Sequence, residues 1–323
     1  MPIQRHTFLG MTAIVASSEM SRVLELAQRV ARSHVAVLIT GETGTGKEIV
    51  ARAIHHFSLR TARPWVDISC GALPELLMES ELFGHEKGAF SGADSAKPGL
   101  FETAHTGTLF LDEVGELDPR MQVKLLRVLD GVPYYRLGSH KKTTVDVRVL
   151  AATNQDLVAA SGHGRFRSDL YHRLAEYQIH VPPLRNRVDD ILPLAEHFLA
   201  QHSGTARFSA AAADALRQYP WPGNIRELRN AVVNAVIAAR SYEIAPEDLP
   251  QSVRARAPRA LVPSSELRLD GLERQAILSA LAISDGHHQR AADLLGISRR
   301  TLTRKLRAYR GELAPEQPSF SIQ

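Results

Sequence analysis

Residues 35–47 read VAVLITGETGTGK, an apolar run followed by a glycine-rich turn that ends in a lysine. The turn fits the spacing G-x-x-x-x-G-K, and the residues after it have a helical pattern. Such a turn wraps phosphate groups, because its glycines bring backbone N–H groups close and the helix N-terminus adds a partial positive charge. The sequence therefore predicts a nucleotide-binding loop formed by Gly41, Glu42, Thr43, Gly44, Thr45, Gly46, Lys47 and Glu48.

The last two residues of this loop have different expected roles. Lys47 is expected to reach the β and γ phosphates of ATP. Glu48 stands where the general motif has Ser or Thr, so the hydroxyl that usually binds Mg²⁺ is missing. A plain glycine turn with an exposed lysine is the alternative, and the apolar run before the turn and the helix after it argue against that alternative.

A second apolar run, Thr108–Leu111, ends in the acidic pair Asp112 and Glu113. A buried strand that delivers two carboxylates at its C-terminal end suits ATP hydrolysis. Asp112 would orient Mg²⁺, directly or through water, and Glu113 would polarise the attacking water. The pair alone is a weak signal, but its position downstream of the glycine-rich loop makes the combination strong.

Three further sets of polar residues follow. Asn154 comes after the run Val147–Ala152 and either senses the γ-phosphate or simply ends a strand. Arg167 and Arg173 either form surface ion pairs or, in a ring of subunits, reach the nucleotide of a neighbour, since guanidinium groups suit phosphate oxygens. Arg226 lies near the start of a predicted helix and is positioned to close over the same nucleotide.

Up to about residue 183 the chain alternates apolar runs with helical stretches, which indicates βαβ units and a largely parallel sheet. The expected strands are Val35–Thr40, Trp65–Ser69, Thr108–Leu111, Asp146–Ala152 and Glu176–His180. Strand signals then stop, and helical stretches at Asp189–His202, Ser209–Tyr219 and Asn224–Arg240 predict a helical lid. The fold class is therefore α/β, with a parallel sheet and a helical lid, followed by an all-α domain.

The all-α domain is predicted from residues 289–309. A short helix, a turn at Gly296, an N-cap at Ser298 and a second helix form a helix-turn-helix. The second helix has no acidic residue from 299 to 310, and its first residues would meet base edges in the DNA major groove. A basic dimerisation helix is the alternative. The expected DNA-binding residues are Arg299, Arg300, Thr301, Thr303, Arg304 and Lys305.

Charge supports the same division of the chain. The 323 residues carry a net charge of +4, yet residues 254–310 contain 12 Lys/Arg against 5 Asp/Glu. A basic end on a slightly acidic body is typical of nucleic-acid-binding domains, although a solvated basic face has the same composition.

A single cysteine, Cys70, excludes an internal disulfide. With no signal-peptide pattern and no apolar run near the ~20 residues that span a bilayer, we expect a cytoplasmic protein without membrane contact.

These patterns divide the chain into six segments. We expect a short N-terminal extension (1–10), an α/β subdomain (11–183), a helical lid (184–250), a linker (251–265), a helix-turn-helix domain (266–310) and a flexible tail (311–323). The linker is predicted from the Arg, Ala, Pro and Ser content of residues 252–265.

Seven segments, in this order, make the chain resemble one known family. They are GETGTGKE, ESELFGHEKGAFSGA, GTLFLDE, AATN, FRSDLYHRL, VPPLRNR and WPGNIREL. Over about residues 11–250 they resemble the AAA+ P-loop ATPase domain of bacterial enhancer-binding proteins, which activate sigma-54 RNA polymerase. The helix-turn-helix resembles the Fis-type domain at the C-terminal end of proteins of this family.

Only about ten residues precede the AAA+ features. The resemblance is thus to the subgroup without a sensory domain, which implies control by a separate regulatory protein or by expression level.

The most specific of these segments contains Gly88, Ala89, Phe90, Ser91, Gly92 and Ala93. In the family the corresponding loop contacts the sigma factor, and an exposed Phe flanked by small residues fits a partner contact better than a plain turn. The chain departs from the family pattern at Ser91, where Thr is usual, and before Arg136, where more acidic residues are usual. It also has Ser69 where the family has an Asn that holds the glutamate corresponding to Glu113, and Ser69 has a shorter reach.

The resemblance implies an ATP-dependent transcriptional activator. It would bind upstream double-stranded DNA, assemble from a dimer into a hexameric ring, and use ATP with Mg²⁺ to convert the closed sigma-54 polymerase complex to the open complex. Two alternatives remain open: a repressor whose ATPase fold is only an oligomerisation scaffold, and a AAA+ helicase or unfoldase. The loop at 88–93 argues against the first, and the loop together with the helix-turn-helix argues against the second.

Overall fold

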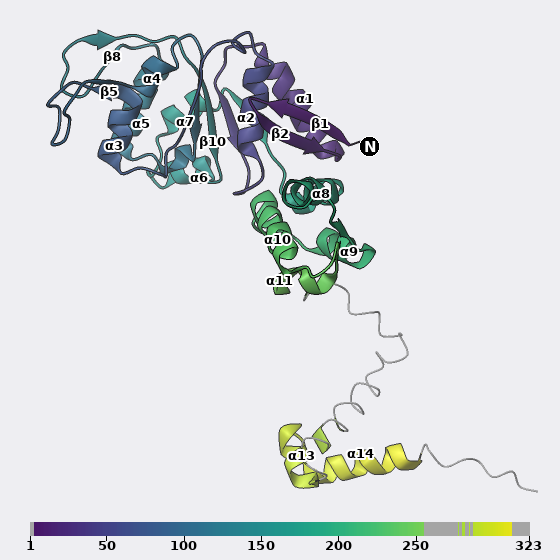
Figure 1. The fold of residues 1–323 in the computed structure, drawn as a ribbon. Helices are drawn as coiled ribbons and strands as arrows, with labels where there is room; N and C mark the ends of the chain where they lie inside the picture. The colour runs from purple at the N-terminus through teal and green to yellow at the C-terminus, as the bar shows by residue number, and fades with distance from the viewer. Residues whose placement is uncertain (1–2, 255–276, 278–279, 282–283, 285–286, 312–323) are drawn as a thin grey trace, which may run out of the picture. The chain divides into compact units, whose positions relative to one another are not determined.

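The computed structural model of the chain describes residues 3–254, 277, 280–281, 284 and 287–311 (Figure 1). These residues belong to two compact units, 1–257 and 258–323. Most of the predicted linker, 255–265, and the predicted tail from 312 onward lie outside the described residues.

A five-stranded parallel sheet forms the centre of the first unit. Its strands, in spatial order, are β11 (Tyr177–His180), β3 (Val37–Thr40), β10 (Arg148–Thr153), β7 (Thr108–Asp112) and β4 (Trp65–Ser69). Every neighbouring pair is parallel, which confirms the predicted α/β class. Because parallel strands end at the same edge, the segments that follow β3, β7 and β10 lie close together there.

Helices cover both faces of this sheet, as parallel strands that are apolar on both sides require. Alternate residues of β3 show the division: Val37 and Ile39 pack with the helices on one face, and Leu38 packs with those on the other. The first face is covered by α1 (Ser18–Ala31) and α2 (Lys47–His56). The second face is covered by α3 (Glu75–Phe83), α4 (Leu100–Thr103), α5 (Pro119–Leu129), α6 (Leu157–Gly162) and α7 (Ser168–Leu174).

Two short antiparallel hairpins extend on the side of α3, α4 and α5 (Figure 1). One pairs β5 (Gly84–His85) with β6 (Lys97–Pro98), and the segment 88–93 lies between these strands. The other pairs β8 (Tyr134–Tyr135) with β9 (Lys142–Thr143). The backbone joins the two hairpins, because Leu137 donates to the carbonyl of Gly84 at 2.9 Å and accepts from the amide of Glu86 at 3.0 Å.

A hairpin also forms at the N-terminus, where the sequence predicted only a short extension. Strand β1 (Gln4–Phe8) pairs with β2 (Met11–Val15) through a two-residue turn in which Leu9 and Gly10 both have positive φ. Two successive positive φ angles match the twist of a tight antiparallel hairpin. Phe8 is buried and its ring packs against those of His56 and Phe57, so β1 is part of the first unit rather than a loose extension.

The predicted lid helices are confirmed with small shifts at their ends. They are α8 (Ile191–His202), α9 (Ala210–Gln218) and α10 (Asn224–Ala238), followed by the short α11 (Gln251–Arg254). They enclose a separate core around the fully buried Trp221, whose indole N–H donates to the carbonyl of Leu216. The sequence analysis missed a small parallel pair in this subdomain, β12 (Arg207–Phe208) with β13 (Glu243–Ile244).

The second unit contains the predicted helix-turn-helix. Helix α13 (His288–Leu294) is followed by a turn in which Gly296 has φ +64°, and α14 (Arg299–Gly311) begins after Ser298. The Ser298 hydroxyl accepts from the amide of Thr301, which is the N-cap that the sequence predicted. Leu302 is fully buried in the small core. None of the helices in the described part of the chain is long and apolar enough to cross a membrane.

Candidate functional site

A cavity of about 540 Å³ lies where β3, β7 and β10 end. Its walls combine the glycine-rich loop with the acidic pair at the end of β7 and with parts of β2, α8 and α10. The structure thus brings together these predicted residues: Thr43, Gly44, Thr45, Gly46, Lys47, Glu48, Asp112, Glu113, Asn154 and Arg226. Gly41, Glu42, Arg167 and Arg173 are not among the described residues that line the cavity.

The loop requires glycine for two separate reasons. Gly41, Gly44 and Gly46 all have positive φ angles, which side chains rarely adopt. The surroundings also leave no room, since a Cβ at Gly41 would lie 2.6 Å from the carbonyl oxygen of Val181. Helix α2 begins at the end of this loop, and the backbone N–H groups of its first turn have no partner within the helix. This backbone fits a phosphate chain.

The buried Lys47 and the half-buried acidic pair, Asp112 and Glu113, form a charged cluster in the cavity. The Lys47 ammonium donates to the carbonyls of Gly41 at 2.8 Å and Glu42 at 3.1 Å. Burial lowers the pKa of Lys47, and the negative charges of Asp112 and Glu113 act in the opposite direction. Burial likewise raises the pKa of Asp112, against the hydrogen bond from the Glu113 amide and the charge of Lys47. Burial thus disfavours the charged forms of Lys47 and Asp112, and the charge of each group partly offsets this effect on the other.

Glu113 has an unusual backbone and a specific partner. Its φ is +55°, in the left-handed region that non-glycine residues seldom occupy. The Ser69 hydroxyl donates to Oε2 of Glu113 at 2.9 Å, and Ser69 pairs with Asp112 in the sheet register. The shorter Ser69 side chain therefore does reach Glu113 in this chain.

The remaining cavity residues have identifiable partners. Asn154, at the end of the strand between β3 and β7, donates to the Thr43 hydroxyl at 3.0 Å. Arg226 is close enough for its charge to lower the pKa of Lys47. Glu48, however, forms an ion pair with Arg52 one turn along α2, at 2.7 Å. The residue that replaces the usual hydroxyl is therefore already paired within its own helix.

The two arginines of the FRSDLYHR segment differ in their surroundings. Arg167 is exposed and forms a two-point ion pair with Asp169, two residues along the chain. Arg173 is more constrained, because it donates to the carbonyl of Leu129 at 2.9 Å and pairs with Glu176 at 2.5 Å. Both are surface ion-pair formers within this chain, and neither contacts the cavity of its own subunit.

The segment 88–93 is a compact, hydrogen-bonded loop. The amide of Gly88 donates to the carbonyl of Ala93 at 2.8 Å, and the amide of Ala93 donates to the carbonyl of Phe90 at 3.0 Å. The expectation of an exposed Phe was wrong: Phe90 is partly buried, with its ring 5.1 Å from that of His85 in an edge-to-face arrangement. Edge-to-face packing gives the aromatic ring a contact within its own loop.

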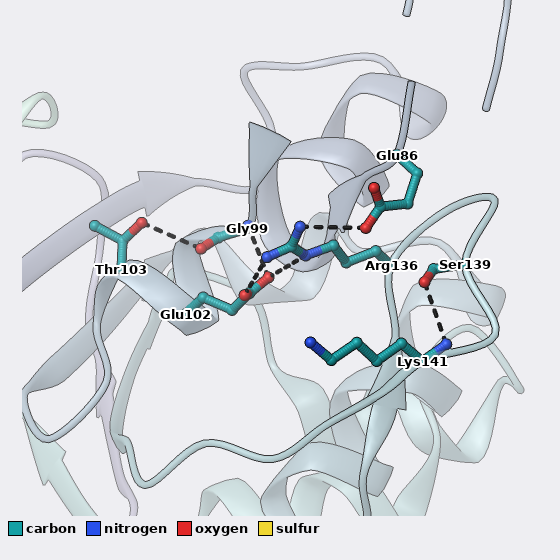
Figure 2. Close-up of polar contacts among 7 residues, drawn as sticks. All are labelled: Glu86, Gly99, Glu102, Thr103, Arg136, Ser139 and Lys141. Atoms are coloured by element: carbon teal, nitrogen blue, oxygen red, sulfur yellow. Dashed lines mark hydrogen bonds and ion pairs between the residues drawn. The ribbon is translucent and has the colours of Figure 1, made fainter. Parts of the chain in front are cut away.

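Figure 2 shows an ion-pair cluster of Arg136, Glu102 and Glu86 that the sequence analysis did not identify. Arg136, from the second hairpin, donates from Nε and Nη2 to both carboxylate oxygens of Glu102 at 2.8 and 2.6 Å. Its third nitrogen donates to Glu86, two residues before the loop, at 3.3 Å. The hydrogen bonds from Arg136 lower the pKa of Glu102. One guanidinium thus links both hairpins to α4.

The start of α14 presents five of the six predicted DNA-binding residues together. Arg299, Arg300, Thr301, Thr303 and Arg304 line one surface hollow with Ser298, and Lys305 is not among the described residues that line this hollow. Leu302 points the other way into the core, which separates the polar face from the packed face. Such a face at the N-terminus of the second helix suits the DNA major groove.

Three family models match the chain along its length. Residues 13–180 match the Sigma-54 interaction domain, 185–265 match the AAA+ ATPase lid domain, and 268–309 match the bacterial regulatory protein model of the Fis family. The chain belongs to the sigma-54 activator family. As a member, it is a sigma-54-dependent transcriptional activator with an AAA+ ATPase domain and a Fis-type DNA-binding helix-turn-helix.

Three individual proteins are similar to this chain over most of its length. The transcriptional regulatory protein ZraR of Escherichia coli K12 is 48% identical over 296 residues, which cover 90% of this chain and 67% of ZraR. The regulatory protein AtoC of the same strain is 45% identical, covering 87% of this chain and 64% of AtoC. The crystal structure of NtrX from Brucella abortus has a TM-score of 0.71 at 34% identity, covering 91% of this chain and 68% of NtrX. The chain thus spans about two thirds of the length of these relatives.

Proposed function

We propose that the chain binds ATP with Mg²⁺ in the cavity and uses its hydrolysis to convert the closed sigma-54 polymerase complex to the open complex. The observation that carries this proposal is the meeting of Lys47, Asp112 and Glu113 in one cavity beside the glycine-rich loop. NtrX from Brucella abortus, solved in complex with ATP, has a TM-score of 0.69 and 34% identity to this chain, which supports the choice of nucleotide.

The side chains in the cavity suit separate tasks in phosphoryl transfer to water. Lys47 binds the β and γ phosphates, and the backbone amides at the start of α2 orient them. Asp112 is placed to hold Mg²⁺, which neutralises phosphate charge when bound. Glu113 is the general base, because its carboxylate accepts a proton from the attacking water. Asn154, directly after β10, and Arg226, on α10 of the lid, contact the γ-phosphate.

A neighbouring subunit completes this site in the proposal. Arg167 and Arg173 lie outside the cavity of their own subunit, and Arg167 is exposed. In a ring of identical subunits, one of them would stabilise the transferring phosphoryl group of the next subunit. We propose a hexameric ring that forms from dimers.

Two surfaces connect hydrolysis to transcription. The loop Gly88, Ala89, Phe90, Ser91, Gly92 and Ala93 would contact the sigma-54 factor, and α14 would hold the ring at an upstream DNA site. The Arg136 cluster ties this loop to the second hairpin, so both hairpins would move together.

In-vitro transcription from a sigma-54 promoter tests the proposal with three variants. Phe90→Ala should hydrolyse ATP at the parent rate and fail to form open complexes. Lys47→Ala should lose both activities, while the control Leu59→Ala, which changes an exposed side chain after α2, should lose neither. If Phe90→Ala or Lys47→Ala activated transcription as the parent does, ATP-driven remodelling through this loop would be wrong, and repression would be favoured.

A further inference from the structure

We propose that Glu42 is not a nucleotide ligand but joins Arg185 and Asn224 in a latch that couples the phosphate loop to the lid. The proposal deepens the proposed ATP-driven function and rests on it. It assigns the second residue of the G-x-x-x-x-G-K loop, together with two lid residues, to transmitting nucleotide binding rather than to binding the nucleotide.

The Glu42 carboxylate is fully engaged by the lid. Arg185 donates from Nη1 to Oε2 at 2.8 Å and from Nη2 to Oε1 at 2.5 Å. Asn224 donates from Nδ2 to Oε2 at 3.1 Å. These hydrogen bonds lower the pKa of Glu42 to about 2, so the carboxylate stays ionised throughout the physiological range. Because both oxygens are used in this way, the side chain faces the lid instead of the cavity.

Asn224 holds three separate segments together. It is fully buried and has φ +52°, a conformation that Asn tolerates better than most residues. Its Oδ1 accepts from the amide of Leu184 at 2.7 Å, and its Nδ2 also donates to the carbonyl of Thr43 at 3.1 Å. The same amide group thus connects the phosphate loop, the start of the lid and the first residue of α10.

The two residues after Thr43 make equivalent contacts. The carbonyl of Gly44 accepts from the amide of Ile225 at 2.9 Å, and the carbonyl of Thr45 accepts from the buried Arg187 at 2.5 Å. Three consecutive loop carbonyls are therefore bonded to the lid, and a Cβ at Gly44 would lie 2.6 Å from the carbonyl oxygen of Gly223. A peptide plane is rigid, so a phosphate that draws a loop N–H toward it also moves the carbonyl bonded to the lid.

The ion pair between Glu42 and Arg185 contributes little to the stability of the fold. The side chains of Glu42 and Arg185 are each 43% exposed, and ion pairs at such positions contribute little to folding. Glu42 and Arg185 instead matter for the coupling between the phosphate loop and the lid, because the pair connects these two segments. Loss of the pair should leave the fold intact and weaken the response of the lid, where α10 also carries Arg226 toward the cavity.

Tryptophan fluorescence provides a direct reporter of this response. The chain has two tryptophans, and Trp221 lies three residues before Asn224 in the turn that docks on the loop. In a Trp65→Phe parent, ATP should change the emission of Trp221. In the same background, Glu42→Gln should lose most of that change while its ATP dissociation constant, measured by calorimetry, shifts by less than about threefold.

Two further variants sharpen the test. The exchange Glu42→Arg with Arg185→Glu restores the ion pair in reverse and should recover part of the fluorescence change, because an arginine at position 42 cannot accept the hydrogen bond from Asn224. Glu81→Gln is the matched control. It removes a two-point ion pair between Glu81 of α3 and Lys97 of β6, neither of which belongs to the lid, and it should behave as the parent.

Each result bears on a distinct claim. If Glu42→Gln abolished ATP binding, Glu42 would be a nucleotide ligand and the latch would be wrong. The latch would also be wrong if Glu42→Gln kept the full fluorescence change, or if the parent bound ATP with no change at Trp221. If the parent bound no ATP, the proposed function would fall first, and the latch with it.

Discussion

The hydroxyl of Ser69 lies 2.9 Å from Oε2 of Glu113 and donates a hydrogen bond to it across the ends of β4 and β7. Glu113 is the proposed general base, and its left-handed backbone fixes where the side chain starts. A hydrogen bond to an ionised carboxylate contributes about 1.5–3 kcal/mol. The contact is therefore strong enough to restrain Glu113 until a competing contact replaces it.

Ser69→Ala should raise ATP turnover in the absence of sigma-54 by several-fold and lower open-complex formation, since the carboxylate becomes free to act without the partner. Ser69→Asn should keep the restraint, because the longer side chain can also donate to Glu113. Steady-state ATPase assays with and without sigma-54 measure both effects. A fall in partner-independent turnover for Ser69→Ala would instead mean that Ser69 orients Glu113 for catalysis.

Mixing two inactive variants should recover ATP hydrolysis if the site spans two subunits. Glu113→Gln and Arg167→Ala should each lower turnover by about 100-fold or more, as expected for the base and for an arginine finger. In an equimolar mixture about a quarter of the interfaces would pair an intact Glu113 with an intact Arg167, and turnover should recover to that fraction.

The matched control for this mixture combines Glu113→Gln with Lys47→Ala. Both changes affect the same side of the interface, so no mixed interface is complete and activity should stay low. If the Arg167→Ala mixture also stayed inactive, while an Arg173→Ala mixture recovered, Arg173 would be the residue that acts on the neighbour.

Arg148 should be important for stability because it is buried at the end of α1. It donates to the carbonyls of Ala31 at 2.7 Å and Val30 at 2.9 Å, and burial lowers its pKa to about 10. Arg148→Ala leaves both carbonyls without these donors and should lower the free energy of unfolding by about 3 kcal/mol in urea titrations. The exposed control Arg63→Ala should change it by less than about 0.5 kcal/mol. Equal effects of the two variants would contradict this role.

His55 should make the fold sensitive to acid. Its ring is buried against Trp65 and contacts the Thr108 hydroxyl, and burial lowers the pKa of His55. As the pH falls below the ordinary histidine pKa of about 6.5, the unfolded chain takes up a proton before the folded chain does. Below a pH of about 6.5, the free energy of unfolding therefore falls by up to about 1.4 kcal/mol per pH unit, until the pH reaches the lower pKa of His55 in the folded chain.

Urea titrations at several pH values between 7.5 and 5.5 measure this loss. His55→Gln removes the titrating group and should give a flatter dependence, although it also weakens the core at neutral pH. His163→Gln, at an exposed position, should keep the parent dependence. A parent slope that His55→Gln leaves unchanged would show that other groups cause the acid sensitivity.

The sheet and the cavity could be predicted because their signals are local. Each strand is a short apolar run, and the groups at the strand ends, such as Asp112 and Asn154, follow directly in the sequence. The contacts that depend on distant segments could not be predicted. Glu42 and Arg185 are 143 residues apart, and nothing near Glu42 distinguishes a lid contact from a phosphate contact.

The hairpins show the same limit. Arg136 and Glu102 are 34 residues apart, so their ion pair appears only once both hairpins are placed. The strand β1 was missed because QRHTF lacks the apolar alternation that marks a half-buried strand. The exposure of Phe90 was predicted from its small neighbours, whereas the histidine that covers it stands five residues earlier.

The packing of Phe90 on His85 affects how strongly a partner protein can bind Phe90 in this loop. A protein that binds Phe90 must first compete with an aromatic contact that the chain already makes with itself. The net affinity is then the difference between two ring environments, and a weaker internal contact would give tighter capture without any change in the partner. A substitution at the buried position 85 would therefore change the affinity of the loop for a partner without changing the residues that the partner contacts.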